Sequence, residues 1–582
     1  MAMELGCSDR VVIEGPKRAV AESDVELFVL GTSQINRQLP DATVGERGES
    51  AIGNSRPADP SAPSLLEDRR QGCNQTSGTG LPHLGLVVPG DRQPVGHYDN
   101  MTFYIGHCGS LSLEPKTPPA VSDRRRREFV GIDDKPASHG EHHATIRPAM
   151  IDSSSKLDLG PFQDTPGYDR AVKLDTSDPL SRFKERFVAT DPHLIYLDGN
   201  SLGRLPDKTE ELVAGVVADE WGDRLIRSWN EGWWELQLRL GDLLAPIVGA
   251  HPGEVIISDS TSVNLFKLAY SAVAARPGRH KIITDDLNFP TDVYVLGGVA
   301  GLFDDDCRMQ IVESDGIHGP VPALTDAIDH DTALVSLSHT VFKSGYTYDM
   351  PELTRLAHES GALVLWDCSH SVGAVPIDFE GAGVDLAIGC TYKYLNGGPG
   401  SPAFLYVRKD LQDELKNPIT AWWGHSDPFA FDLEFEPVSG IRRFHTGTMP
   451  MLSLAAAEPG IADVLEAGMV EIRSKSMALT RYFVELWRTF LSPLGFRMGS
   501  PEDSAIRGSH VSLTHDDAWP IARALIERAK VIPDFRAPDS LRFGFSPLYT
   551  SFVDVHTAAH RLRALVENEV HLEYAGVKAT VT

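Results

Sequence analysis

The residues best suited to chemistry in this chain are a lysine, an aspartate and a group of hydroxyls. Lys393 lies in the glycine-rich segment 389–400, directly after a short apolar run. An amine held out of bulk water at such a place can form a Schiff base with an aldehyde cofactor. A lysine beside a glycine turn is otherwise most often a solvated loop residue. We interpret Lys393 as catalytic because of the residues that accompany it.

Two further features complete a pattern with this lysine. Asp367 directly follows the apolar run 362–366, at the expected C-terminal end of a strand, where open α/β sheets gather the groups that bind ligands. Its carboxylate could pair with a protonated pyridine nitrogen, or it could cap the next helix. Thr261 and Ser262 begin a segment that is apolar on nearly every side, which predicts a buried helix. The start of such a helix can bind an anion, although Ser and Thr at a helix start are most often simple caps. A phosphate anchor, a pyridinium partner and a Schiff-base lysine together predict a site for pyridoxal 5'-phosphate.

The elements that must position these residues alternate between helical and strand-like patterns. The strand-like apolar runs are 280–284, 333–337, 362–366, 385–389 and 403–407. This alternation predicts an α/β fold with a mostly parallel sheet that is covered on both faces. A cap at Asp207 and the apolar spacing that follows it predict a helix there. A long helical pattern from Leu454 to Trp487, followed by shorter pieces, predicts a smaller α/β domain.

Seven segments, in order, resemble kynureninases, which are fold type I pyridoxal phosphate enzymes of the class V aminotransferase superfamily. These segments are 196–203, 260–265, 289–292, 366–370, 392–396, 422–425 and 542–549. The resemblance implies a large domain with a mostly parallel seven-stranded sheet and a smaller C-terminal α/β domain. We expect the cofactor-binding domain at 166–450, with its first 35 or so residues packed on the small domain at 451–582.

The resemblance also implies hydrolysis of L-kynurenine, and of its 3-hydroxy form, to anthranilate or 3-hydroxyanthranilate and L-alanine, in tryptophan catabolism or NAD biosynthesis. Lys393 would bind the cofactor and act as the base, and Tyr392 would contact the cofactor and relay protons. Arg542 would bind the substrate α-carboxylate, although an arginine in a strand is otherwise most often a surface ion pair. The other residues expected to contact cofactor or substrate are Asn200, Ser201, Thr261, Ser262, Phe289, Pro290, Thr291, Asp292, Asp367, His370, Trp422 and Thr448. In the family, Trp422 and Thr448 reach the site from the neighbouring subunit, which implies a homodimer with shared sites.

The composition limits the classes to which the chain can belong. Its 582 residues carry a formal charge of -27, which argues against a nucleic-acid-binding surface. No apolar run approaches the roughly 20 residues of a membrane helix, and the start lacks the pattern of a secretory signal. The six cysteines show neither CxxC pairs nor the spacing of a disulfide framework, which favours a reducing cytoplasm. We expect a cytoplasmic enzyme with a small-molecule substrate and no metal, nucleic-acid or membrane partner.

The first part of the chain, 1–165, differs in kind from the rest. It is rich in Gly, Pro, Ser, Asp and Arg and has few sustained apolar periodicities, so we expect a low-complexity, disordered extension. Its arginine run 124–127 could bind an anionic partner, and its histidine-rich segment 139–143 could bind a metal. Isolated charged runs are mostly solvated, and we favour that interpretation for both.

Two alternative functions remain open at this point. A cysteine desulfurase or selenocysteine lyase would share the fold, but these enzymes place histidine rather than Tyr392 before the lysine and need a nucleophilic cysteine. A non-catalytic binding protein is disfavoured because every expected cofactor contact is present. Within kynureninases, the small residues Gly447 and Thr448 resemble the type that prefers kynurenine to 3-hydroxykynurenine. The aryl ring of the substrate would then face one of three tryptophans, Trp229, Trp233 or Trp234.

Overall fold

The computed structural model describes residues 162–303 and 307–576. The arginine run 124–127, the histidine-rich segment 139–143 and almost all of the predicted extension 1–165 lie outside these residues. Within the described part of the chain, none of the helices combines the length and the apolar character that a membrane span requires.

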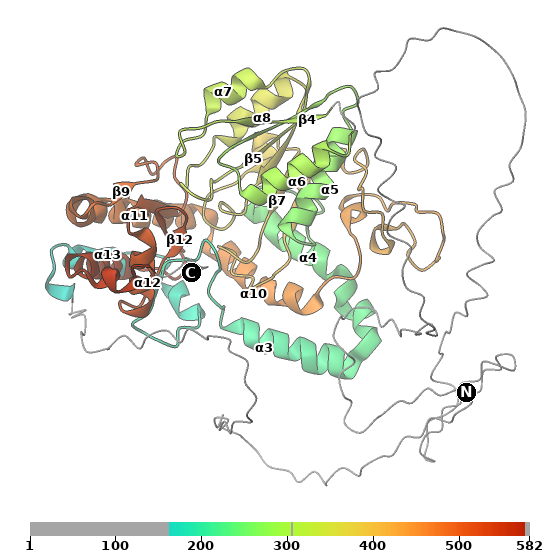
Figure 1. Cartoon of the computed structure of the whole chain (residues 1–582). Coiled ribbons are helices and arrows are strands. Elements are labelled where there is room, and N and C mark those ends of the chain that lie inside the picture. Colours follow the sequence, from blue (N-terminus) through green and yellow to red (C-terminus); the bar gives the residue numbers. More distant parts are fainter. Residues whose placement is uncertain (1–161, 304–306, 577–582) are drawn as a thin grey trace, which may run out of the picture. The chain divides into compact units, whose positions relative to one another are not determined.

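Among the described residues, seven strands form the central sheet (Figure 1). In spatial order they are β2 (Val255–Ile257), β8 (Phe404–Val407), β7 (Leu386–Gly389), β6 (Leu363–Asp367), β5 (Thr332–Ser338), β3 (Lys281–Asp285) and β4 (Arg308–Val312). The pairings from β7 to β4 are all parallel, whereas β8 is antiparallel to both of its neighbours. The predicted mostly parallel sheet is therefore confirmed.

Helices cover both faces of this sheet, which explains the continuous apolar runs. They are α4 (Trp234–Leu244), α5 (Thr261–Ala274), α6 (Pro290–Ala300), α7 (Val321–Ala327), α8 (Met350–Glu359), α9 (Phe379–Ala382) and α10 (Met451–Ala467). In β6, Leu363 and Leu365 share a core with α5 and α6, which lie side by side in Figure 1. Val364 and Trp366 share the opposite core with α4, α8 and α10. A strand that is buried on both faces has no polar alternation to show.

The structure departs from the sequence prediction in two respects. Strands β2 and β4 were not predicted, because β2 has three residues and most side chains of the edge strand β4 are exposed. The helical pattern from Leu454 to Trp487 consists of two helices, α10 and α11 (Met469–Leu486). Gly468 between them has a φ of 78°, a conformation that favours glycine and ends the first helix.

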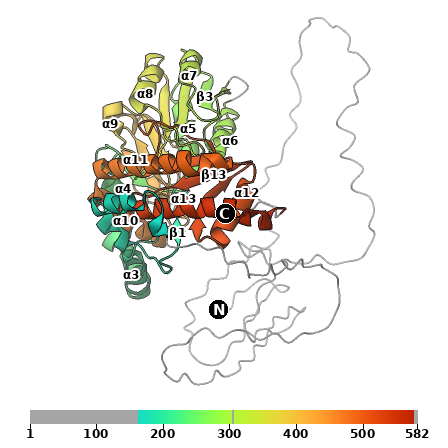
Figure 2. The same cartoon turned by 90° about the vertical axis from the view of Figure 1, so that its left-hand side faces the viewer.

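A second, antiparallel sheet comes later in the chain. Its strands, in spatial order, are β12 (Asp534–Arg536), β13 (Ser540–Gly544), β10 (His510–Thr514) and β9 (Arg497–Met498). The helices that accompany it are α11, α12 (Ala518–Glu527) and α13 (Phe552–Glu567), seen in orange and red in Figure 2. Phe483, Val511, Leu541 and Leu562 belong to its hydrophobic core, which is distinct from the two cores of the central sheet.

The first described segment, residues 162–197, packs into this second hydrophobic core through Ala171, Ile195 and Leu197. Strand β1 (Ile195–Tyr196) pairs in parallel with β11 (Val531–Ile532), and Asp175 in α2 (Tyr168–Thr176) accepts a hydrogen bond from the Phe552 N–H over 2.7 Å. The chain then continues through α3 (Lys208–Gly215) to the central sheet. The expected boundaries at 166, 450 and 451 stay a prediction.

Candidate active site

A pocket of about 290 Å3 lies at the C-terminal edge of the central sheet. Residues reach it from the ends of different strands: Asp367 ends β6, Lys393 follows β7, and Phe289 follows β3. In open α/β sheets this edge is the usual place for a ligand. The pocket is lined by Asn200, Ser201, Thr261, Ser262, Phe289, Thr291, Asp292, Asp367, Ser369, His370, Tyr392, Lys393, Arg536 and Arg542.

Most of the predicted site residues therefore meet in one space. The exceptions are Pro290, Trp422 and Thr448, which do not line it. Pro290 occupies the first position of α6, directly between two residues that do. Ser369 and Arg536 line the pocket without having been predicted.

The loop that carries the lysine is fixed by its backbone. The carbonyl of Tyr392 accepts a hydrogen bond from the Gly203 N–H over 2.7 Å, and that of Lys393 accepts one from the Asn396 N–H over 3.0 Å. A Cβ atom at Gly203 would collide with the Lys393 carbonyl oxygen, so this close approach requires glycine. Nζ of Lys393 lies 3.3 Å from Nε2 of His370. The loop thus holds the amine beside the His370 ring.

His370 lies between two cationic side chains. Its ring is buried, and Nε2 is 3.4 Å from Nη1 of Arg542 as well as close to Nζ of Lys393. Burial, and then the charges of Lys393 and Arg542, lower the pKa of His370 well below its ordinary value. The ring is therefore neutral at physiological pH and can accept a hydrogen bond from a neighbouring cation.

Two aspartates meet on another side of the pocket. Asp367 accepts a hydrogen bond from the Ser369 N–H over 2.8 Å. Asp292 is buried, and its Oδ2 has no hydrogen-bond partner. Burial, and then the nearby charge of Asp367, raise the pKa of Asp292 well above its ordinary value. A buried carboxyl group with a raised pKa thus lies beside Asp367, whose side chain can bind a cationic ring nitrogen.

Helix α5 begins at the pocket with two hydroxyl side chains. Ser260 caps the helix by accepting a hydrogen bond from the Val263 N–H over 3.4 Å. Thr261 and Ser262, in the first turn, line the pocket. Free backbone N–H groups and the helix dipole favour an anion at such a place, so the helix start can bind a phosphate.

Two arginines enter the pocket from the second sheet. The buried guanidinium of Arg542 donates hydrogen bonds to the Phe342 carbonyl over 2.6 Å and to Ser201 Oγ over 2.9 Å, and it pairs with Asp534 over 2.5 Å. Arg536 pairs with the same oxygen of Asp534 over 2.9 Å. Because two guanidinium groups share one carboxylate, the pair can also bind a carboxylate from a substrate. The spacing of Asp534 and Arg536, two residues apart, was a signal that both lie on one face of a strand.

Trp422 and Thr448 lie on the surface of the chain. Trp422, in the short helix η9 (Trp422–Gly424), is 42% exposed. Its neighbour Trp423 stacks on Trp234 with ring centroids 4.6 Å apart. Thr448 is also exposed, just before α10. Neither residue lines the pocket that contains Lys393.

The pocket fits pyridoxal 5'-phosphate. The unpaired carboxyl oxygen of Asp292, the carboxylate of Asp367, the helix start at Thr261 and the amine of Lys393 surround a space suited to a small cofactor. Phe289, which is 36% exposed, adds an aromatic ring. Together with the mostly parallel seven-stranded sheet, this arrangement defines a fold type I pyridoxal phosphate-dependent enzyme.

Comparisons with known proteins identify the family. A family model described as the kynureninase C-terminal domain matches residues 472–562. A kynureninase of Pseudomonas fluorescens is 44% identical over 403 residues, which cover 68% of this chain and 95% of that protein. A kynureninase of Burkholderia pseudomallei strain K96243 is 44% identical over 407 residues, which cover 69% and 96%. The chain belongs to the kynureninase family.

Solved structures support the fold more broadly. The apo cysteine desulfurase of Thermococcus onnurineus NA1 has a TM-score of 0.57 at 18% identity and covers 68% of this chain and 98% of its own. A cysteine desulfurase of Escherichia coli has a TM-score of 0.56 at 16% identity, with the same coverage. These proteins share the fold with this chain, and the sequence comparisons do not favour their activity as its function.

Proposed function

We propose that this protein hydrolyses the Cβ–Cγ bond of L-kynurenine, consuming one water and releasing anthranilate and L-alanine. The 3-hydroxy form would be a second substrate, giving 3-hydroxyanthranilate. The observation that carries this proposal is the meeting of the Lys393 amine, two aspartates and a buried arginine in one pocket of about 290 Å3. The kynureninase relatives, 44% identical, support the choice of substrate. The products place the enzyme in tryptophan catabolism or NAD biosynthesis.

Each part of the cofactor has residues that would hold it. Thr261 and Ser262 at the start of α5 would bind the phosphate, Asp367 the ring nitrogen, and Phe289 one face of the ring. Lys393 would bind the aldehyde carbon. When bound, pyridoxal 5'-phosphate supplies an aldehyde that joins the substrate amine and a ring that withdraws electrons from the substrate.

The chain's own residues would move protons and orient the substrate. The Lys393 amine, beside the neutral His370, would remove the proton from the substrate α-carbon. The neighbouring Cys390, and then burial, raise the pKa of Tyr392 above its ordinary value, so its hydroxyl keeps a proton that it can donate at the β-carbon after cleavage. Arg542 would hold the α-carboxylate so that the scissile bond is aligned, and orientation of this kind is worth up to roughly 7 to 11 kcal/mol.

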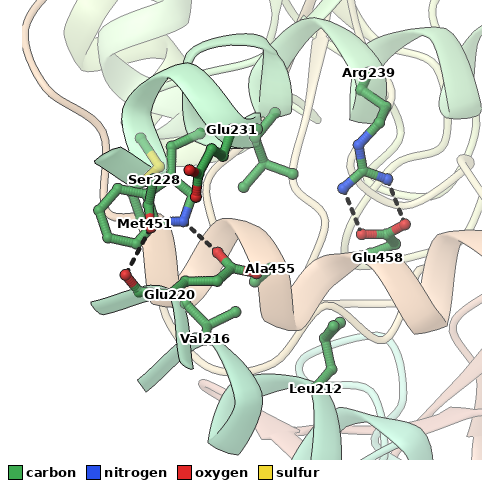
Figure 3. A pocket seen from close by; sticks show the side chains of 12 residues that line it. Leu212, Val216, Glu220, Ser228, Glu231, Arg239, Met451, Ala455 and Glu458 are labelled. Atoms are coloured by element: carbon green, nitrogen blue, oxygen red, sulfur yellow. Dashed lines mark hydrogen bonds and ion pairs between the residues drawn. The ribbon is translucent and has the colours of Figure 1, made fainter. Parts of the chain in front are cut away.

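We further propose a homodimer whose two active sites are shared, in which Trp422 and Thr448 reach the partner's pocket. Both are exposed in the protomer. A separate pocket of about 400 Å3 lies between α3, α4 and α10, where Arg239 pairs with Glu458 (Figure 3). The segment that lines part of this pocket also carries four exposed apolar side chains close together in the sequence, at Val217, Trp221, Leu225 and Ile226. A group of exposed apolar side chains, unlike a single one, favours a partner surface.

Light scattering tests the dimer with a matched pair of variants. Ile226→Asp is expected to give monomers with reduced activity, because it adds a charge to the proposed interface. Val470→Asp, at an aliphatic residue of α11 that is 79% exposed, is the control and should stay dimeric. A monomeric wild-type protein would contradict the proposal.

A cytoplasmic location remains a prediction from the scattered cysteines.

The activity itself is tested with the purified protein and two substrates. Addition of L-kynurenine should produce anthranilate fluorescence and an equal amount of L-alanine. Addition of L-cysteine should release no sulfide above the background of Lys393→Ala. Sulfide release without anthranilate would favour a desulfurase and overturn the proposal.

A further inference from the structure

A buried ion pair lies directly behind the start of helix α5. Lys267, within α5, is fully buried, and its Nζ donates hydrogen bonds to Asp259 Oδ2 over 2.7 Å and to the Phe444 carbonyl over 2.8 Å. Asp259 immediately precedes the capping residue Ser260 and has a φ of 51°. An ammonium group this deep is costly unless it is paired, so Lys267 requires the carboxylate at 259. Neither residue lines the pocket.

Asp259 connects three segments that carry candidate site residues. Its Oδ2 also accepts a hydrogen bond from Ser258 Oγ over 2.9 Å, and its Oδ1 accepts one from Thr446 Oγ1 over 2.8 Å. Its backbone carbonyl accepts one from the Ala403 N–H over 2.8 Å. Ala403 follows the glycine-rich loop of Lys393, and Thr446 lies two residues before Thr448. One aspartate thus joins the helix start, the lysine loop and the segment of Thr448.

The charges of this cluster are consistent with a permanent ion pair. Burial alone would raise the pKa of Asp259, but the adjacent Lys267 and its hydrogen bonds lower it overall. Burial lowers the pKa of Lys267, and Asp259 opposes that change. The nearby ring of His445 stays neutral, because burial and then the charge of Lys267 lower its pKa to about 3. The cluster therefore contains one cation and one anion.

We propose that Asp259 is a positioning residue that, with Lys267, fixes the start of α5 relative to Lys393 and so sets the affinity for the cofactor phosphate. This inference rests on the proposed function, because it presumes that Thr261 and Ser262 bind that phosphate. Free helix N–H groups bind a phosphate only when the helix start is held at the right distance from the other anchor of the ligand. The ion pair supplies that constraint from inside the protein.

The test measures cofactor affinity in two matched double variants. Asp259→Gly/Lys267→Met removes both charges together, keeps a residue that tolerates a positive φ, and fills the volume of the lysine. The control is Asp178→Gly/Lys475→Met, at a pair that is 2.6 Å apart with side chains 3% and 5% exposed and that lies outside the pocket. Each protein is freed of cofactor and titrated with pyridoxal 5'-phosphate, with absorbance and calorimetry as readouts.

The dissociation constant is expected to rise at least fivefold in the first variant and to stay within twofold of wild type in the control. Saturating cofactor should restore kcat/KM for kynurenine. A smaller rise, an equal rise in the control, or an activity loss that excess cofactor does not restore would overturn the inference. If this double variant does not fold, Asp259→Asn/Lys267→Met, which also removes both charges but keeps a side chain of similar size at position 259, is judged by the same criterion. Failure of the wild-type protein to bind the cofactor would instead refute the proposed function.

Discussion

The substitution Asp198→Asn is expected to stabilise the protein strongly at pH 8 and less at pH 5. Asp198 follows β1, and its Oδ1 is buried without a hydrogen-bond partner. Burial, and then the charge of Asp534, raise the pKa of Asp198 from an ordinary 3.8 to about 6, against the opposing effects of Ser201, Arg542 and Arg536. Asparagine has the same shape and no charge to bury.

The size and sign of the effect follow from proton linkage. The folded state binds this proton more tightly than the unfolded chain, so the carboxyl destabilises the fold progressively as the pH rises from below 3.8 to above about 6. The difference between the two pKa values corresponds to about 3 kcal/mol at pH 8 and about half of that at pH 5, at roughly 1.4 kcal/mol per pH unit. Asparagine removes this cost.

Urea unfolding at the two pH values measures the effect. The increase in the free energy of unfolding of Asp198→Asn over wild type should be larger at pH 8 than at pH 5 by about 1.5 kcal/mol. Asp219→Asn, at an exposed aspartate, is the control and should show the same small difference at both pH values. An equal gain at both pH values, or a loss of stability at pH 8, would refute the reasoning.

Three further results are expected from the candidate site. Arg542→Lys keeps the charge but loses the planar fork, so kcat/KM for kynurenine should fall by roughly 30- to 150-fold, equivalent to about 2 to 3 kcal/mol; a wild-type value would contradict the assigned role. Phe289→Leu removes a ring whose stacking contributes about 0.5 to 1.5 kcal/mol, so titration should show binding of pyridoxal 5'-phosphate weakened by roughly 2- to 10-fold. With small residues at Gly447 and Thr448, kynurenine should have a higher kcat/KM than 3-hydroxykynurenine, and the reverse order would show that prediction to be wrong.

The fold could be predicted from the sequence wherever burial leaves a strong pattern. β6 is apolar throughout because both faces are covered, and it ends in Asp367, so both the strand and the carboxylate at its end were visible. β4 was missed because an edge strand with exposed side chains has no such pattern. The break at Gly468 was missed because one glycine inside a helical pattern is often tolerated.

The candidate site was predictable where a residue type and its neighbours in the sequence already indicated a chemical role. Lys393, Asp367 and the hydroxyls in the first turn of α5 come from separate segments, and the sheet edge brings them together. Arg536 and Asp259 were not predicted, because their importance depends on partners far away in the sequence. Arg536 matters through the carboxylate that it shares with Arg542, and Asp259 through its contacts with Lys267 and Thr446.

The most direct test of the account is to locate the covalent bond between the protein and its cofactor. Purified protein is loaded with pyridoxal 5'-phosphate, reduced with borohydride, digested and analysed by mass spectrometry. We predict the added mass of the reduced cofactor on the peptide that contains Lys393, and its loss in Lys393→Ala. The same mass on a different lysine, or no labelled peptide at all, would contradict the central claim.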